Sequence, residues 1–524
     1  MVYPNRRAVG TANLGFQAVV AQVAGHPGYT CHRAFADHPR TLEAGRGLDR
    51  YDLVALSLSF EGDYPAALEM LAGAGIPLRA RDRDGPLVLA GGVAPTLNPE
   101  PLAPFVDVVL VGEAEAGLGA LLDLFLETRS LTRPDRLAAL ARAALPGVYV
   151  PSAYRVDEPP AGPIVRRAAA GAPERVARVW VPVPWDPART RIWYPDDVFQ
   201  GAYLLEVSRG CPHGCRFCAA GYATRPPRFL PVELLEPLVR QGAGWTGRVG
   251  LVGAAVSDHP GFADLARCAL DAGATFTVSS FRAENLTPEA VELLARGGTR
   301  TLTVALEAGS PRLRALLGKT IGDQDLLEAA RLAGEAGIRN LRVYAMVGLP
   351  TETDDDVGRL ADLAVGARRA LGSGTVTLSV APFVPKPHTP LQWEPMAPEP
   401  LLRRRIRLLE SLCGRHPGVR AVAEAPKWAR VQGLLSRGGR SVAPLLEQAV
   451  RTGDWRAVLR TPLARAELDE PRSPASPLPW DFLDGVPGRD ALLRERDRGL
   501  RGLDPLPCRP GHCRLCGVCS ETRN

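Results

Sequence analysis

Six short apolar strands, each followed by a helical segment, recur between residues 203 and 385, and this repeat constrains the fold more than any other feature. Repeated strand–helix units of this length build a parallel barrel whose chemistry lies on the loops after the carboxyl ends of the strands. Six units predict a partial barrel rather than a closed one of eight strands. The predicted strands are 203–209, 248–253, 275–281, 301–307, 341–348 and 376–382.

A second α/β pattern precedes the barrel. Near-continuous apolar strands at 52–60, 86–92 and 106–112 alternate with helical segments, which predicts a doubly wound domain with a parallel sheet. The fold class is therefore α/β, with a doubly wound N-terminal domain, a partial (β/α)6 barrel and a helical C-terminal region that ends in four cysteines. The predicted boundaries are 1–145 for the first domain, 146–200 for a Pro- and Arg-rich linker with one or two strands, 201–395 for the barrel and 396–524 for the C-terminal region.

Composition excludes several classes of protein. The chain of 524 residues has no run of eighteen apolar residues and no signal-peptide core at its start, so we expect a cytoplasmic protein without a membrane partner. A net charge of +6 is too mild to indicate nucleic-acid binding by itself. Only Lys319, Lys386 and Lys427 among the 63 basic residues are lysine; the excess of arginine is a bias of composition, and we hypothesise that an ammonium group is required at these three places.

Three cysteines directly follow the first predicted barrel strand. Cys211, Cys215 and Cys218 have the spacing C-x3-C-x2-C on a loop that contains glycine and proline. Three thiolates so close together can hold three irons of a [4Fe–4S] cluster and leave the fourth iron open. A structural zinc site would need a fourth ligand, for which His213 inside the loop is the nearby candidate. The position above a barrel strand favours a working site over a structural one.

With this motif the sequence resembles the radical S-adenosylmethionine (SAM) superfamily, in which an aromatic residue precedes the last cysteine. Phe217 occupies that place. The resemblance implies that Cys211, Cys215 and Cys218 hold the cluster and that Phe217 contacts the adenine. It also implies that the open iron chelates SAM, and that one electron cleaves SAM to methionine and a 5′-deoxyadenosyl radical.

Other barrel segments resemble cofactor-binding segments of the same superfamily. The resemblance places Glu307 and Ser310, after the fourth strand, near the methionine and ribose of SAM, and it places Gly348 in a G-L-P-x-E turn after the fifth. Arg282, at the end of the third strand, could face the carboxylate of SAM as a fork-shaped donor.

The segment after the second barrel strand departs from the superfamily pattern. The run Gly253-Ala254-Ala255-Val256-Ser257-Asp258 stands where Gly-Gly-Glu is common. Backbone carbonyls of this run could still meet the ammonium of SAM. Ser257 and Asp258 are the candidates to replace the missing acid.

The N-terminal domain resembles the cobalamin-binding type that precedes many radical SAM barrels. The resemblance rests on a G-G-x-x-P-T run at 91–96 and a G-E-x-E run at 112–115. The D-x-H-x-x-G loop that supplies a ligand to cobalt is absent from the sequence. Either cobalamin binds without a protein ligand to cobalt, or the domain only gates the barrel. Tyr3-Pro4-Asn5 stands where the first strand of such a domain already ends, so we expect a start upstream of Met1.

The C-terminus carries a second cysteine cluster, Cys508, Cys513, Cys516 and Cys519. The C-x2-C-x2-C spacing suits a second iron–sulfur cluster, with Cys508 as the fourth ligand, and zinc is the alternative. Together with the run 382–393 and the run 478–481, this tail resembles one radical SAM subgroup, which combines an N-terminal cobalamin-type domain with a Cys-rich C-terminus.

The leading functional hypothesis is a radical SAM enzyme that modifies a macromolecule, either RNA or protein, by methylthio or methyl transfer. A flavodoxin- or ferredoxin-type protein is the expected electron donor. The arginines around 403–405 and Arg407 fit this role, but a solvated helix face explains them slightly better. The alternatives are cobalamin-dependent methylation of a small metabolite and a non-catalytic redox or assembly protein that carries iron–sulfur clusters.

Overall fold

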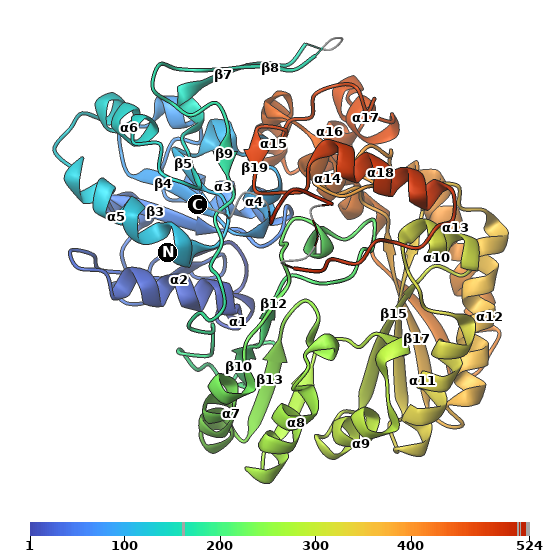
Figure 1. The fold of residues 1–524 in the computed structure, drawn as a ribbon. Coiled ribbons are helices and arrows are strands. Elements are labelled where there is room, and N and C mark those ends of the chain that lie inside the picture. Colours follow the sequence, from blue (N-terminus) through green and yellow to red (C-terminus); the bar gives the residue numbers. More distant parts are fainter. Residues whose placement is uncertain (160–162, 511–512, 514, 520–524) are drawn as a thin grey trace. The chain divides into compact units, whose positions relative to one another are not determined.

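The computed structural model describes residues 1–159, 163–510, 513 and 515–519. The chain divides into two compact units (Figure 1). The first unit comprises Met1–Pro182, Thr190–Gln200 and Val431–Val486, and the second comprises Val183–Arg189, Gly201–Arg430 and Pro487–Asn524. The C-terminal region predicted at 396–524 is thus shared between the units: 431–486 belong to the first unit and the cysteine tail belongs to the second.

The first unit is built on a six-stranded sheet of order β2-β1-β3-β4-β5-β6. All strand pairs are parallel except β5 with β6, which is antiparallel. The order 2-1-3-4-5 is that of flavodoxin-like doubly wound folds, so the predicted fold class is confirmed for this unit. The strands are β1 (Val2–Tyr3), β2 (Ala34–Phe35), β3 (Leu53–Ser57), β4 (Leu87–Gly91), β5 (Val108–Leu110) and β6 (Val148–Tyr149).

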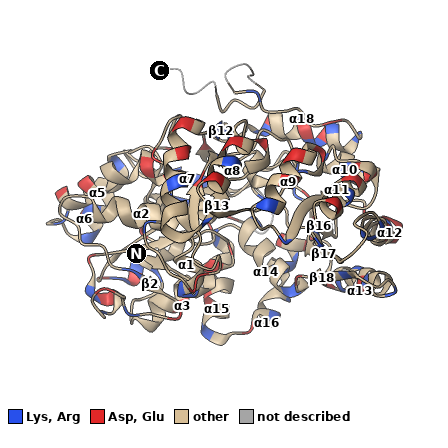
Figure 2. Ribbon diagram, turned by 90° about the horizontal axis from the view of Figure 1, so that it is seen from below, with Lys and Arg blue, Asp and Glu red and all other residues tan. Residues whose placement is uncertain are grey.

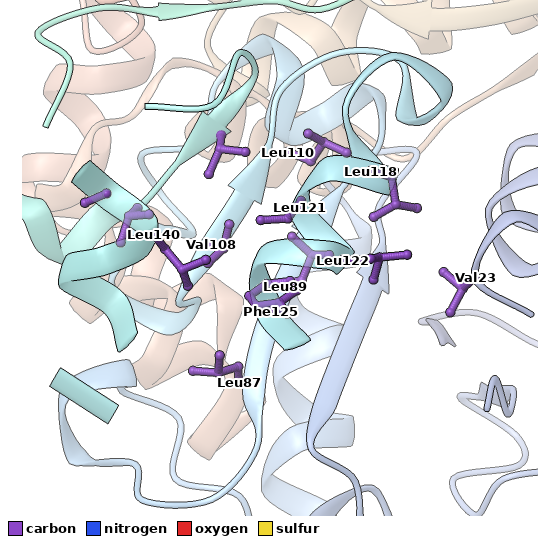
Figure 3. Packing of buried hydrophobic residues seen from close by; sticks show 13 residues of the cluster. Val23, Leu87, Leu89, Val108, Leu110, Leu118, Leu121, Leu122, Phe125 and Leu140 are labelled. Atoms are coloured by element: carbon purple, nitrogen blue, oxygen red, sulfur yellow. The ribbon is translucent and has the colours of Figure 1, made fainter. Parts of the chain in front are cut away.

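A leucine-rich helix supplies much of the core on one face of this sheet. Helix α5 (Leu118–Glu127) buries Leu118, Leu121, Leu122 and Phe125, a spacing that places all four on one side of a helix. Figure 3 shows these side chains packed with residues of β4 and β5. The other helices of the first unit are α1 (Arg7–Gly10), α2 (Leu14–Ala24), α3 (Asp63–Gly73), α4 (Val93–Leu97), α6 (Arg133–Arg142), α15 (Ala443–Thr452), α16 (Trp455–Leu459) and α17 (Pro462–Asp469).

The predicted linker at 146–200 contains four short strands, two more than the sequence indicated. Strand β6 extends the sheet, β7 (Tyr154–Asp157) and β8 (Val165–Ala168) form a hairpin, and β9 (Val176–Ala177) pairs with β19 (Leu483–Asp484). Strands of two residues are too short to show alternation, and a partner about 300 residues away leaves no local signal.

The second unit contains the predicted barrel strands and one more. Strands β10, β13 and β14 form one parallel sheet, and β15, β16, β17 and β18 form another. A parallel bridge between Phe281 and Val304 joins the two sheets. The strands are β10 (Tyr203–Glu206), β13 (Arg248–Val252), β14 (Thr275–Val278), β15 (Thr301–Glu307), β16 (Asn340–Val347), β17 (Thr375–Pro382) and β18 (Val419–Ala423).

The added strand β18 lies in a region that the sequence indicated to be helical. It pairs in parallel with β17 and has only one fully buried residue, so its hydrophobic signal is weak. The helices are α7 (Val232–Thr246), α8 (Phe262–Asp271), α9 (Pro288–Arg296), α10 (Pro311–Leu317), α11 (Asp323–Glu335), α12 (Asp354–Ala370), α13 (Glu399–Gly414), α14 (Pro426–Arg437), which crosses the unit boundary, and α18 (Arg489–Leu500).

Basic and acidic residues are interspersed along the helices (Figure 2). Among the described residues, no helix combines the length and the apolar character that a membrane crossing needs.

Candidate active site at the cysteine loop

The three-cysteine loop is clamped at its base by a two-stranded hairpin. Strand β11 (Ser208–Arg209) precedes the loop and pairs antiparallel with β12 (Arg228–Phe229), which follows it. Gly210 opens the loop with φ +72°, where a Cβ would stand 2.7 Å from the carbonyl oxygen of Thr224. Only glycine fits this close approach without strain. The chain thus leaves the carboxyl end of β10 through a fixed turn and presents the cysteines there.

The three cysteines of the loop lie close to one another, Cys215 buried and Cys211 and Cys218 half-buried. Burial raises the pKa of Cys211 to about 12, and the neighbouring Cys218 and Cys215 add to this effect. Burial, together with Cys215, also raises the pKa of Cys218. Buried thiolates that repel one another require a cationic partner, and iron supplies one. The chemistry of these three donors therefore fits the cluster that the motif implies.

The three thiols are not arranged around a single metal ion. Across the residues that the structure describes, no three His, Cys, Asp or Glu side chains are grouped as ligands of one ion. Four sulfurs around one zinc, each at about 2.3 Å from it, would stand about 3.8 Å apart. A four-iron cluster gives each thiolate its own iron, so its ligands stand further apart.

His213, the candidate fourth zinc ligand, is engaged with a carboxylate. Its Nε2 lies 2.7 Å from Oδ1 of Asp258, which also accepts a hydrogen bond of 3.0 Å from Asn285. The hydroxyl of Ser257 lies 3.5 Å from the other oxygen of Asp258. Asp258 therefore anchors the cysteine loop to the segment after β13, and Ser257 lies beside this contact.

Two cations approach the cysteine loop, and both are paired with carboxylates. Nη1 of Arg282 lies 3.8 Å from Sγ of Cys215, and its Nη2 pairs with Glu284. Lys319 donates from Nζ to the carbonyl of Ala305 at 3.0 Å and lies 3.3 Å from Oε1 of Glu307. Burial disfavours this ammonium group, but Glu307 and then Cys215 outweigh burial and raise the pKa of Lys319.

Glu307 occupies a strained position at the end of β15. Its φ is +73°, and the register with β16 shifts between Ala305 and Glu307. Non-glycine residues in this region cost of order 1 kcal/mol or more and concentrate at functional sites. The Lys319 ion pair helps to fix the side chain, whose exposed fraction is 12%.

Ser310 and Gly348 have local structural roles. Ser310 caps α10 by accepting a hydrogen bond from the Leu313 amide at 3.3 Å. The Gly348 amide donates to Oε2 of Glu352 at 2.6 Å, and φ at Gly348 is +81°. Both residues shape the loops that follow β15 and β16.

Phe217 packs into a buried cluster at the same end of the barrel. This cluster includes Ala308, Leu317, Met346 and Phe383, which lie on or directly after the barrel strands and on α10. The half-buried ring therefore fixes the last turn of the cysteine loop against the barrel. The structure thus brings the cysteine loop, Arg282, Glu307 and Asp258 together, with Lys319 beside them.

Several supports of this site escaped the sequence analysis. Arg216, inside the loop, is fully buried and pairs with Glu495 of α18 through Nε at 2.9 Å and Nη2 at 2.6 Å. Arg405, interpreted as part of a basic helix face, is also buried and pairs with Glu352 at 2.7 Å. The partners lie 279 and 53 residues apart, so no local pattern could reveal them.

The motif residues of the first unit hold segments of that unit together. Thr96 accepts a hydrogen bond from the Gly112 amide at 3.0 Å, and Asn98 donates to the carbonyls of Ser436 and Gly438 at 3.0 and 2.8 Å. Gly92 and Gly112 have φ of +114° and +117°, and a Cβ at either would collide with a neighbouring backbone.

Comparison with known proteins agrees with this geometry. The family described as "Radical SAM proteins, N-terminal" matches residues 15–151, and the family described as "Radical SAM superfamily" matches residues 205–364. The chain is 28% identical over 453 residues to the protein MJ0966 of Methanocaldococcus jannaschii, covering 85% of this chain and 90% of that one. It is also 28% identical over 413 residues to MK0932 of Methanopyrus kandleri, covering 69% and 72%.

A solved structure shares the fold over most of the chain. The radical SAM methyltransferase TsrM from Kitasatospora setae, with cobalamin and a [4Fe–4S] cluster bound, aligns with a TM-score of 0.52 at 16% identity. The alignment covers 87% of this chain and 98% of TsrM. The radical SAM domain implies a [4Fe–4S] cluster and SAM as cofactors. Because both of its domains match and the cysteine loop stands above the first barrel strand, the chain belongs to the radical SAM superfamily.

Proposed function

We propose that this protein is a cobalamin-dependent radical SAM methyltransferase. The observation that carries the proposal is the combination of a flavodoxin-like unit with a barrel that presents three closely spaced cysteines. The same combination of folds occurs in TsrM, whose structure holds cobalamin and a [4Fe–4S] cluster.

Three thiolates, those of Cys211, Cys215 and Cys218, would hold the catalytic cluster and leave one iron for SAM. When bound, the cluster and SAM supply one-electron cleavage and a 5′-deoxyadenosyl radical. Arg282 is near enough to Cys215 to meet the carboxylate of SAM. Glu307, held by Lys319, would accept hydrogen bonds from the cofactor. A flavodoxin- or ferredoxin-type protein is the proposed electron donor.

Cobalamin would bind in the first unit, at the carboxyl ends of its parallel strands. In sheets of this order, ligands bind where the strand order reverses, here between β1 and β3. Phe60 and Val93, which follow β3 and β4 in the chain, expose 49% and 52% of their surface, so apolar area is available there. Because the sequence has no D-x-H-x-x-G loop, we propose binding without a protein ligand to cobalt.

The structure weakens the argument for an RNA acceptor. Arg403 and Arg404 pair with Glu399 and Asp354, and Arg405 is buried against Glu352. A methylthio transfer that draws on a second cluster would need an open iron, whereas the tail offers four thiols. Methyl transfer is therefore the proposed reaction, and its acceptor is either a small metabolite or a macromolecule.

The test is anaerobic reconstitution with iron, sulfide and cobalamin, followed by incubation with SAM, a reductant and size-fractionated cell extract. SAM labelled in its methyl group should transfer the label to one size class of extract. The protein should also retain cobalamin after gel filtration. Label transfer that does not depend on cobalamin would contradict the proposal, and failure to form 5′-deoxyadenosine would favour a non-catalytic cluster protein.

A further inference from the structure

Four cysteines of the C-terminal tail line a small cavity or lie close to it within the second unit. Cys508 and Cys516 are buried, and Cys513 and Cys519 are half-buried. Cys508, Cys513 and Cys516 line a cavity of about 40 Å³, together with Tyr222, Arg225 and residues of α18. Because one water needs about 10–15 Å³ measured in this way, the cavity has room for more than a single ion.

The four thiols form one quartet, since Cys513, Cys516 and Cys519 all interact electrostatically with Cys508. Four cysteines grouped in this way are the usual ligand set of an iron–sulfur or zinc centre.

A buried arginine is directed at this quartet. Arg225 is 6% exposed, stacks on the ring of Tyr222 with its Cζ 4.3 Å from the ring centroid, and donates from Nε to the carbonyl of Gly221 at 2.7 Å. The guanidinium also hydrogen-bonds to Cys516 and interacts with Cys508. These contacts fix a permanent positive charge beside a site whose ligands become anionic when they bind metal.

The tail that carries the quartet also braces the three-cysteine loop. The amide of Cys508 donates to the carbonyl of Pro212, the residue after Cys211, at 2.9 Å. A Cβ on Gly214 would stand 2.8 Å from Cβ of Pro505, so only glycine allows the tail to approach this closely. Arg216 donates to the carbonyl of Leu503 at 2.8 Å. The quartet therefore begins where the tail contacts the loop.

We propose that the four C-terminal cysteines hold a second, fully ligated iron–sulfur cluster with Arg225 as its charge partner, and that assembly of this cluster locks the three-cysteine loop in place. The role of the loop rests on the proposed function, but the second cluster does not. Four thiolates saturate a four-iron cluster and leave no open iron for SAM, substrate or sulfur transfer.

Iron is favoured over zinc by the cavity, which has more room than a single ion needs. The C-x2-C-x2-C spacing of Cys513, Cys516 and Cys519 also suits an iron–sulfur cluster.

The experiment compares five forms of the full chain after anaerobic reconstitution: the unchanged protein, Cys516→Ala, Arg225→Gln, Cys31→Ala and Arg240→Gln. The controls are Cys31→Ala, a cysteine of the first unit, and Arg240→Gln, an exposed arginine of α7. Iron and zinc are counted per chain, and hydrogen exchange is followed in the loop 210–218.

The unchanged protein and both controls should bind about eight irons, and Cys516→Ala should bind about four. Exchange in 210–218 should become at least about tenfold faster in Cys516→Ala, and Arg225→Gln should show an intermediate effect. Four irons in the unchanged protein, or one zinc per chain that is lost in Cys516→Ala, would overturn the second cluster. A halved iron count with unchanged loop exchange would overturn the locking role. Failure of methyl transfer with eight irons retained would count against the proposed function alone.

Discussion

The two cysteine groups of the second unit offer the same donor atom in different numbers. The loop after β11 offers three thiols, whereas the tail offers four. At the loop, Arg282 and Lys319 are each paired with a carboxylate, Glu284 and Glu307 respectively. At the tail, the guanidinium of Arg225 contacts the thiol of Cys516 and stacks on Tyr222.

The difference shows that the number of ligands and the surrounding charges can give two similar cysteine motifs different roles. A three-thiol site leaves one iron open and needs hydrogen-bonding groups that can receive SAM, so polar pairs lie at its rim. A four-thiol site leaves no iron open, so it needs no groups that receive SAM. A packed arginine and contacts with the three-cysteine loop are enough to stabilise it. The comparison predicts that changes at the loop abolish chemistry, whereas changes at the tail weaken the loop indirectly.

The largest effect is expected for Cys218→Ala. Losing one of three ligands should prevent stable assembly of the catalytic cluster, so 5′-deoxyadenosine should fall below detection by liquid chromatography. Iron should fall by about half, because the tail keeps its own centre. Cys31→Ala is the control and should behave like the unchanged protein. Retention of radical formation in Cys218→Ala would remove the distinction between the two sites.

Lys319→Met should be the next most damaging change. It leaves the carboxylate of Glu307, with 12% of its side chain exposed, without its cation. Breaking a buried pair by removing one partner costs about 3–5 kcal/mol, which a urea titration of the second unit would detect. SAM cleavage should fall with it.

Lys319→Arg tests whether the ammonium itself is required at this position. The longer, planar guanidinium retains the charge but fits the space beside Ala305 and Glu307 poorly, so we expect a partial loss of stability and cleavage. Full activity in Lys319→Arg would show that the rarity of lysine in this chain carries no functional information at residue 319.

The stability of the protein is expected to depend on pH through the carboxyl group of Glu352. Burial raises the pKa of this carboxyl to about 7, against the opposing effects of the Gly348 amide and Arg405. The folded state therefore binds the proton more tightly than the unfolded state, so stability should fall as pH rises from about 4.5 to about 7. Relative to Glu352→Gln, the loss should reach at most about 3 kcal/mol. Parallel stability curves for the two proteins from pH 5 to 8 would contradict this expectation.

Arg282→Gln and Arg225→Gln should each change the reduction potential of a different centre. Removing a cation beside an anionic cluster lowers the reduction potential, and each change should affect mainly its own centre. The shift should be on the order of tens of millivolts, small within the range over which proteins tune such clusters. Potentiometric titration followed by electron paramagnetic resonance would resolve both signals. Equal shifts of both signals in either variant would show that the centres share one electrostatic environment.

The smallest effect is expected for a combined Arg403, Arg404 and Arg407→Gln variant. Arg403 and Arg404 form exposed pairs, which contribute at most about 1 kcal/mol each, and Arg407 is exposed. Iron content, 5′-deoxyadenosine formation and retention on RNA should all stay near those of the unchanged protein. A marked loss of RNA retention would instead support the hypothesis that RNA is the acceptor.

Local sequence patterns were sufficient to predict much of the fold. The six predicted barrel strands and the three central strands of the first sheet are all present, because buried parallel strands produce apolar runs that a single sequence reveals. Strand β18 escaped prediction because only one of its residues is buried, and the linker holds two more strands than expected because strands this short show no alternation. The lysine count drew attention to Lys319 before its contacts with Ala305 and Glu307 were visible.

Motif spacing identified the cysteines but not what supports them. Asp258 was a candidate for binding SAM, and the structure shows its carboxylate anchoring the loop through His213. Arg405 was part of a basic run, and the structure shows it buried against Glu352 in the G-L-P-x-E turn. In both cases the partner, rather than the residue type, defines the role.

The sequence by itself determined the superfamily, the two cysteine sites and the α/β architecture, because ligand spacing and hydrophobic periodicity are properties of neighbouring residues. Only the tertiary structure decided that the tail contacts the catalytic loop, through the Cys508 amide and the Arg216–Glu495 pair. Those contacts join residues nearly 300 positions apart. Their energy depends on burial and on charge pairing, which exist only once the chain has folded.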